Sequence, residues 1–147
     1  MNVSPPTMAG PRHSHYMNTL SKIATDIAYP VKNNARLAAC VVYKNDIVSF
    51  GINEMKSHPF QAKWGTNKEA IFLHAEVSAI KNALKQITLK EFEKSTLYVC
   101  RVRYEDWTKQ RLVFGLSKPC DGCIRCISTF NLRSVYYSLD DSGYQLL

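Results

Sequence analysis

The amino-acid sequence predicts a layered α/β domain whose sheet contains at least one parallel connection. Segments rich in β-branched and aromatic residues alternate along the chain with segments of helical periodicity, which is the order typical of such folds. The chain has 147 residues, of which 46% are hydrophobic, so it is long enough for one hydrophobic core and short for two. We therefore expect a single domain over residues 16–147.

The first segment, residues 1–15, reads MNVSPPTMAGPRHSH and has no apolar face to bury. Its prolines, glycine and small polar residues predict a disordered leader, in which His13 and His15 would be solvated. Helical periodicity then runs from Tyr16 to Tyr29, and Pro30 ends it.

The middle of the chain predicts a hairpin, a loop and a helix. Two β-branched runs over residues 36–53 flank Lys44-Asn45-Asp46, the pattern of an antiparallel hairpin, with Cys40 as a small buried residue. Residues 54–68 lose all periodicity and predict a surface loop. Residues 73–87 carry the apolar stripe of an amphipathic helix.

The last third predicts two strands around a turn, at 96–104 and 111–116, then a helix over 120–131 and a strand over 133–138.

Composition narrows the class of protein. Nineteen Lys and Arg residues against twelve Asp and Glu give a net charge of +7, which favours phosphate-bearing partners without requiring nucleic acid. The sequence has no run of eighteen apolar residues and no secretory signal pattern, so we expect a cytoplasmic protein with no membrane segment. Three of the five cysteines crowd into residues 120–126, a spacing that suits reduced thiols or a metal site.

The stretch LHAEVSAI places two polar residues, His74 and Glu76, inside an apolar helical run. In mid-helix they would lie roughly 200° apart around the axis, so we expect His74 in the first turn, where both can reach one cleft. Thr66 and Glu69 have the spacing of a capping box and favour an earlier start, which a short separate turn before His74 would reconcile.

The stretch SKPCDGC supplies two thiols at a second helix start. Pro119 suits the first helical position, and Cys120 and Cys123 would project to one side. A helix N-terminus favours thiolate, the form that binds metal.

Two thiolates and one imidazole leave the fourth tetrahedral position of a zinc ion open, as in catalytic sites. Water there ionises near pH 7, and Glu76 is placed to move protons. Cys126 lies a further turn along the helix, so we expect it to be buried rather than bound to zinc.

His74-Ala75-Glu76 and Pro119-Cys120-Asp121-Gly122-Cys123 resemble the H-x-E and P-C-x-x-C signature of zinc-dependent cytidine and deoxycytidylate deaminases. The resemblance covers roughly residues 16–138. It implies a three-layer α-β-α cytidine-deaminase-like fold with a mixed sheet of about five strands, Zn²⁺ held by His74, Cys120 and Cys123, and Glu76 as the catalytic residue. It further implies deamination of a cytosine nucleotide, with dCMP as the best guess, by a homo-oligomer.

The resemblance also implies substrate contacts. Asn53 matches a position that faces the sugar and base, and the amide of Ala75 with carbonyls around Ser117 and Lys118 would hold the base edge. Weaker candidates are His58, in the loop, and Tyr137 or its neighbour in the last strand, for which core packing is favoured.

Two features depart from the family pattern. Ser78 stands where many deoxycytidylate deaminases have Asn, which weakens the assignment of a monophosphate substrate. Residues 101–117 form a basic, hairpin-sized detour that could frame the mouth of the pocket.

Other functions stay open. The same motifs also resemble those of transfer RNA adenosine deaminases. In such an enzyme, Trp64 and Trp107 could stack on bases of RNA or single-stranded DNA. A zinc-stabilised binding module would not need Glu76. Riboflavin-pathway deaminases have more widely spaced cysteines than Cys120 and Cys123.

Overall fold

The computed structural model describes residues 11–27, 36–54, 58–64 and 73–147. Within these residues, six strands form one mixed sheet, in the order β2-β1-β3-β5-β6 with β4 paired to β3. The pair β3–β5 is parallel and the other pairs are antiparallel. The strands are β1 (Arg36–Tyr43), β2 (Asp46–Ile52), β3 (Thr96–Tyr104), β4 (Leu112–Gly115), β5 (Ser134–Ser138) and β6 (Tyr144–Leu146).

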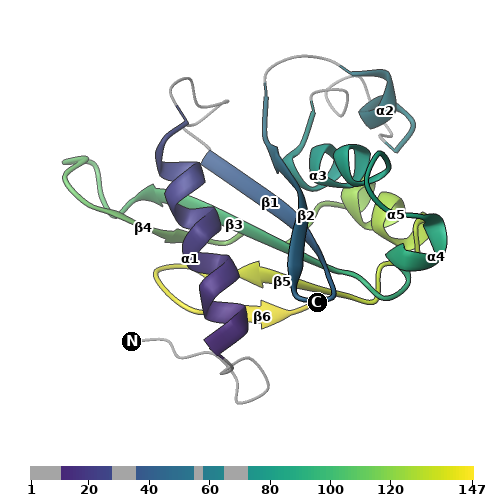
Figure 1. The fold of residues 1–147 in the computed structure, drawn as a ribbon. Coiled ribbons are helices and arrows are strands. Elements are labelled where there is room, and N and C mark those ends of the chain that lie inside the picture. The colour runs from purple at the N-terminus through teal and green to yellow at the C-terminus, as the bar shows by residue number, and fades with distance from the viewer. Residues whose placement is uncertain (1–10, 28–35, 55–57, 65–72) are drawn as a thin grey trace.

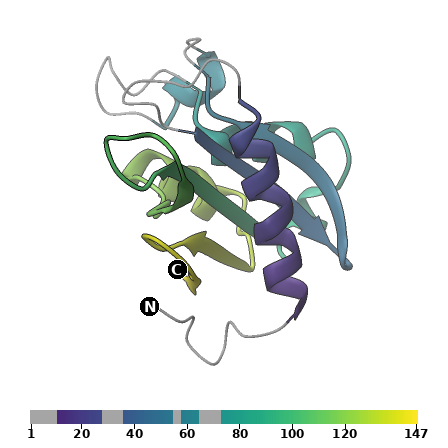
Figure 2. The same ribbon diagram turned by 90° about the vertical axis from the view of Figure 1, so that its left-hand side faces the viewer.

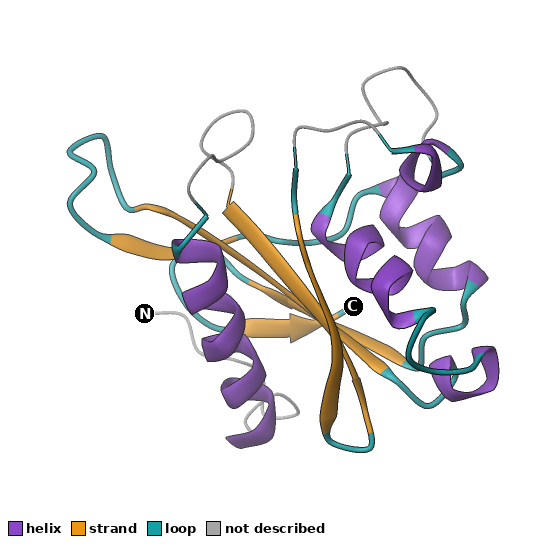
Figure 3. Cartoon of the chain, turned by 45° about the horizontal axis from the view of Figure 1, so that its top comes forward, coloured by secondary structure: helices purple, strands orange, loops and turns teal. Residues whose placement is uncertain are grey.

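Helices cover both faces of the sheet (Figures 1 and 3). Helix α1 (Pro11–Thr25) packs on one face against β1 and β3 (Figure 2), and α3 (Ala75–Ala83) packs on the other against β1 and β2, beside α5 (Asp121–Thr129). The short helices are α2 (Pro59–Ala62) and α4 (Leu89–Phe92). The predicted three-layer α-β-α fold is therefore confirmed. In the part of the chain that the structure describes, every helix is too short or too polar to cross a membrane.

The predicted hairpin forms with a two-residue turn. Lys44 and Asn45 have φ of 51° and 68°, the left-handed conformation that matches the twist of hairpin strands. Gly51 then brings β2 unusually close to α3, because a Cβ at this position would lie 2.5 Å from the carbonyl oxygen of Ala75 and 2.4 Å from the amide nitrogen of Ala79. The first turn of α3 is thus fixed directly on the sheet.

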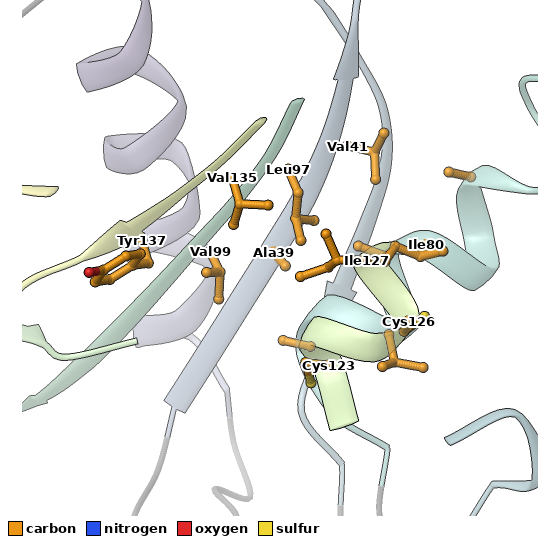
Figure 4. Close-up of a cluster of buried hydrophobic side chains, with 14 of the residues drawn as sticks. Ala39, Val41, Ile80, Leu97, Val99, Cys123, Cys126, Ile127, Val135 and Tyr137 are labelled. Carbon is orange, nitrogen blue, oxygen red and sulfur yellow. The ribbon is translucent and has the colours of Figure 1, made fainter. Parts of the chain in front are cut away.

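Alternating strand residues build one apolar cluster on each face. Ala39, Val99 and Tyr137 belong to the cluster that also contains Cys123 and Cys126 of α5 (Figure 4). On the α1 face, the strand residues that alternate with these pack against Tyr16, Met17, Leu20 and Ala24. Cys40 and Cys100 belong to this second cluster and are fully buried, as predicted for Cys40.

Some predicted boundaries are wrong. Helix α1 begins at Pro11, so residues 11–15 are helical rather than part of a leader; residues 1–10 lie outside the described residues. His13 is half-buried, because it packs against Tyr136 with ring centroids 4.3 Å apart. Tertiary contacts with the sheet therefore extend the helix beyond its apolar periodicity.

Three further elements went unpredicted. The helix expected over 73–87 ends at Ala83, and Thr88 then starts α4 with a capping box to Glu91. Helix α2 lies inside the expected loop. Strand β6 adds to the sheet edge by pairing with β5, although its few residues show no alternating pattern long enough to read.

Candidate metal centre

His74 stands at the entrance of α3. It is the N-cap residue, with φ −85° and ψ 153°. Because its backbone is not helical, the helical spacing that would place it on the opposite side of the axis from Glu76 does not apply to its side chain. We expected His74 in the first turn, and the structure places it one position earlier, at the N-cap. Thr66 and Glu69, with the spacing of a capping box, lie outside the described residues. The backbone N–H of His74 donates to Oε1 of Gln61 at 3.0 Å, so α2 holds the residue in place.

The two thiols stand at the entrance of α5. Cys120 is the N-cap residue and Cys123 lies in the first turn. Pro119 precedes the N-cap rather than taking the first helical position, which Asp121 occupies. The N-termini of α3 and α5 therefore both face the cluster, and their aligned peptide dipoles favour negative charge there.

The three side chains converge. Nδ1 of His74 lies 3.3 Å from Sγ of Cys123 and 3.5 Å from Sγ of Cys120, and the three donor atoms all lie within 4.8 Å of one another. A tetrahedral zinc ion, with bonds of about 2.3 Å to sulfur and about 2.0 Å to nitrogen, holds neighbouring donors roughly 3.5 Å apart. The donor set therefore fits zinc in both chemistry and spacing.

The thiols differ in their protonation. The hydrogen bond from Cys123 is the largest of the interactions that lower the pKa of Cys120, to about 3. The same hydrogen bond, followed by burial, raises the pKa of Cys123. Hydrogen bonding to Cys120 raises the pKa of His74, and Glu76 contributes. Cys120 is thus a thiolate at neutral pH, ready to bind a cation.

Glu76 is buried in the first turn of α3, with 4% of its surface exposed. Burial raises the pKa of this carboxyl group, while interactions with His74 and Cys123 oppose the shift. A buried carboxyl group beside the three donor side chains can bind and release a proton nearer neutral pH than an exposed carboxyl group can.

The candidate substrate contacts belong to three elements or connections. Ala75 is buried as the first residue of α3, and Asn53 follows β2, where its Oδ1 accepts from the amide of Leu37 at 2.9 Å. The hydroxyl of Ser117 donates to the carbonyl of Val99 at 2.9 Å, so its side chain serves the fold. Lys118 is exposed. Their contacts with a substrate stay predictions.

The weaker candidates have structural roles. His58 caps α2, because its Nδ1 accepts from the amide of Phe60 at 3.0 Å. Tyr137 is buried in the core with 6% exposure, so it packs as expected. Burial raises the pKa of Cys126 to about 12, and this thiol lies in the core beside Cys123 rather than in the cluster of donors.

Two residues near the cluster were missed from the sequence. Gln61 is 1% exposed and joins α2 to His74. Nε of Arg125, on α5, donates to the carbonyl of Trp64 at 3.0 Å. Both contacts involve the segment over residues 54–68, which lacks periodicity. Its only sequence signal was its length, since loops this long are usually functional.

Comparison with known proteins decides the family. A model of the cytidine and deoxycytidylate deaminase zinc-binding region matches residues 11–139. The chain belongs to this deaminase family. Zinc is therefore the metal of the deaminase, which has His74, Cys120 and Cys123 positioned as its potential ligands.

Solved structures share the fold of the deaminase. The dCMP deaminase from the cyanophage S-TIM5 in apo form is 20% identical, with a TM-score of 0.58 over 92% of this chain and 85% of that chain. The same enzyme in complex with dCMP and dUMP gives 20% identity and a TM-score of 0.56 over 92% and 83%. Form 2 of Acinetobacter baumannii RibD is 15% identical, with a TM-score of 0.50, and the match covers 87% of this chain and 28% of that chain. No curated protein matches the sequence significantly.

Proposed function

We propose that the deaminase hydrolyses the exocyclic amine of a cytosine nucleotide, with dCMP as the preferred substrate, to give the uracil nucleotide and ammonia. The observation that carries this proposal is the buried carboxyl group of Glu76 beside a cluster of one imidazole and two thiols. Zinc held by His74, Cys120 and Cys123 would supply Lewis acidity and a fourth position at which water ionises near neutral pH.

Glu76 moves the protons of the reaction. Its carboxylate accepts a proton from the attacking water and passes it to the ring nitrogen next to C4. It then takes the second proton from the hydroxyl group at C4 and delivers it to the departing amine. Water supplies the oxygen of the new carbonyl group, and the C4–N bond breaks to release ammonia. Burial in the first turn of α3 keeps this carboxyl group away from bulk water, which strengthens its interaction with charge that develops nearby.

One observation supports a free nucleotide as substrate, and two support a phosphate group on it. The S-TIM5 dCMP deaminase, which shares the fold, was solved with dCMP and dUMP. The net charge of +7 suits a phosphate group. Lys118 is exposed two residues before Cys120 and, among the described residues, takes part in no ion pair. We therefore assign Lys118 to the substrate phosphate.

The polynucleotide alternative is less well supported. Trp64 packs against Phe60 and Phe130, with ring centroids 6.2 Å apart in each pair, so it is not a free platform for a base. Trp107, on the β3–β4 connection, is 89% exposed. Strands of nucleic acid are usually held by several stacking side chains along a groove, so one exposed indole favours this reading only weakly.

The test measures ammonia release and product mass for zinc-loaded protein with dCMP, dCTP, cytidine, a single-stranded oligonucleotide and transfer RNA. We expect conversion of dCMP, no conversion by Glu76→Ala with zinc retained, and loss of both zinc and activity in Cys120→Ala. Conversion of the polymers alone would overturn the substrate, and full activity of Glu76→Ala would overturn the mechanism.

Two broader expectations accompany this function. All five cysteines are free, which fits the reducing cytoplasm in which we place the enzyme. Assembly into a homo-oligomer stays a prediction from the family resemblance, and light scattering of the zinc-loaded protein measures it.

A further inference from the structure

A cavity of about 600 Å³ lies on the α1 side of the sheet, away from the candidate metal centre. Its walls come from the N-terminal end of α1, the β1–β2 turn and the starts of β3 and β5. Tyr16, Val42 and Tyr98 belong to the core cluster on the α1 face, whereas Cys123 belongs to the opposite one. The sheet therefore separates this cavity from the candidate active site. Its volume falls within the range of pockets for small molecules.

Four cations from separate segments converge on this cavity: Arg12 of α1, Lys44 of the turn, Lys94 before β3 and Arg133 before β5. None of the described lining residues is acidic, and none of the four cations is in an ion pair with a described residue. Glu91 lies near the rim, where its carboxylate interacts with Tyr43 and Lys44, so the excess of positive charge is carried mainly by Arg12, Lys94 and Arg133. A concave surface with an excess of one charge concentrates ions of the opposite charge.

Other lining residues of the cavity add hydroxyl groups to these charges. Oγ1 of Thr96 and Oγ of Ser134 lie 2.9 Å apart across the parallel pair β3–β5. The Tyr98 hydroxyl lies 2.6 Å from Nδ1 of His13, and Tyr98 stacks on Tyr136 with ring centroids 5.3 Å apart. These contacts hold the aromatic wall in place. The cavity is therefore lined both by hydroxyl groups held in hydrogen bonds and by exposed cationic side chains.

We propose that this cavity binds a small phosphorylated molecule. Phosphate oxygens are acceptors with high charge, and they match a site that combines guanidinium groups, ammonium groups and hydroxyl donors. Arg133 and Lys94 are neighbours through the backbone, because the amide of Arg133 donates to the carbonyl of Ser95 at 3.0 Å. These two cations form the primary phosphate site, and Arg12 and Lys44 close it from the α1 side. The proposal does not depend on the deaminase activity.

The test uses full-length, zinc-loaded protein labelled with ¹⁵N. Fructose 1,6-bisphosphate and ribose 5-phosphate are titrated as probes, with ribose as the uncharged control, while amide shifts are followed. We expect the bisphosphate to shift amides of Thr96 and Ser134 with a dissociation constant below about 1 mM, the monophosphate to bind more weakly, and ribose to have no effect.

Charge reversal locates the site. Lys94→Glu with Arg133→Glu should weaken bisphosphate binding by roughly tenfold or more, since charge-assisted hydrogen bonds are the strong ones. Lys85→Glu with Lys109→Glu, at two exposed lysines outside the cavity, should change it by less than about twofold, because exposed charges at a distance are screened. The milder pair Lys94→Gln with Arg133→Gln should lie between the two, and it replaces the first pair if charge reversal prevents folding.

Three outcomes would overturn the proposal. The first is the absence of shifts at the cavity with either phosphate probe. The second is equal weakening by the cavity pair and the distant pair, which would show only general attraction to a basic protein. The third is a set of shifts confined to residues 74–76 and 120–123, which would place the phosphate at the metal cluster.

Discussion

Replacing Gln61 tests how the fold holds the zinc-binding histidine in place. Gln61 is 1% exposed, and its Oε1 accepts the backbone N–H of His74 at 3.0 Å. The substitution Gln61→Met keeps the length and approximate volume of the side chain but removes the acceptor. The N–H of His74 then loses its partner at the position where the ligand must be held before metal binds.

The magnitude follows from the type of bond lost. An N–H left without a partner in a buried place costs about 1–3 kcal/mol. Part of this cost falls on the stability of the metal-free protein, and the remainder weakens zinc binding, since a less ordered ligand must be ordered by the metal. Residues that orient metal ligands typically contribute about 10- to 100-fold to affinity. We expect Gln61→Met to weaken zinc binding by at least about tenfold.

The assay is a zinc competition with a chromophoric chelator, together with denaturant unfolding of the metal-free protein. The same change at an exposed position, Gln86→Met, is the matched control. The reasoning is refuted if Gln61→Met leaves both zinc affinity and unfolding free energy equal to those of the control. Lower stability with unchanged affinity would limit Gln61 to the packing of α2.

Three other predictions follow from the packing and charge of the site. Gly51→Ala places a methyl group against the backbone of α3 and should destabilise the fold by about 1–3 kcal/mol or more, whereas Gly115→Ala meets only the flexible side chain of Arg101, 2.9 Å away, and should cost less in the same denaturant titration. Because burial raises the pKa of Glu76 above 4.5, the folded state holds this proton to higher pH than the unfolded chain does. The contribution of Glu76 to the stability of the metal-free protein is therefore lost as pH rises above 4.5. Glu76→Gln should flatten that part of the pH profile of thermal stability and should also abolish turnover. An unchanged pH profile would contradict the assigned burial of Glu76. Cys126→Ser should keep one zinc ion per chain by elemental analysis and Cys123→Ser should lose it, so loss of zinc in both would make Cys126 a ligand.

Local patterns predicted the parts of the fold that depend on neighbouring residues. Lys44-Asn45 determines a hairpin through its own backbone preferences, and the spacing of Cys120 and Cys123 is set by one helical turn. The prediction that His74 lies at the start of the helix was also local, because it rested on the spacing between His74 and Glu76; the structure places His74 at the N-cap, one position before the first turn.

What the sequence did not reveal depends on contacts between distant segments. His13 belongs to α1 because it packs on Tyr98 and Tyr136, 85 and 123 positions away. The buried amide of Gln61 acquires its role from a partner 13 positions later. Such residues leave no periodic trace, since the partner that explains them can be recognised only once the chain is folded.

The convergence of two helix entrances on one metal has a consequence for the architecture as a whole. His74 and Cys120 are 46 positions apart in the sequence, so a zinc ion bound to both acts as a cross-link that closes a long loop. For a covalent link, closing a loop of that length lowers the entropy of the unfolded chain by the equivalent of about 4 kcal/mol. The metal that gives the site its chemistry therefore also ties α3 to α5. On the opposite face, α1 is held to the sheet by side-chain packing and by hydrogen bonds such as the one between His13 and Tyr98.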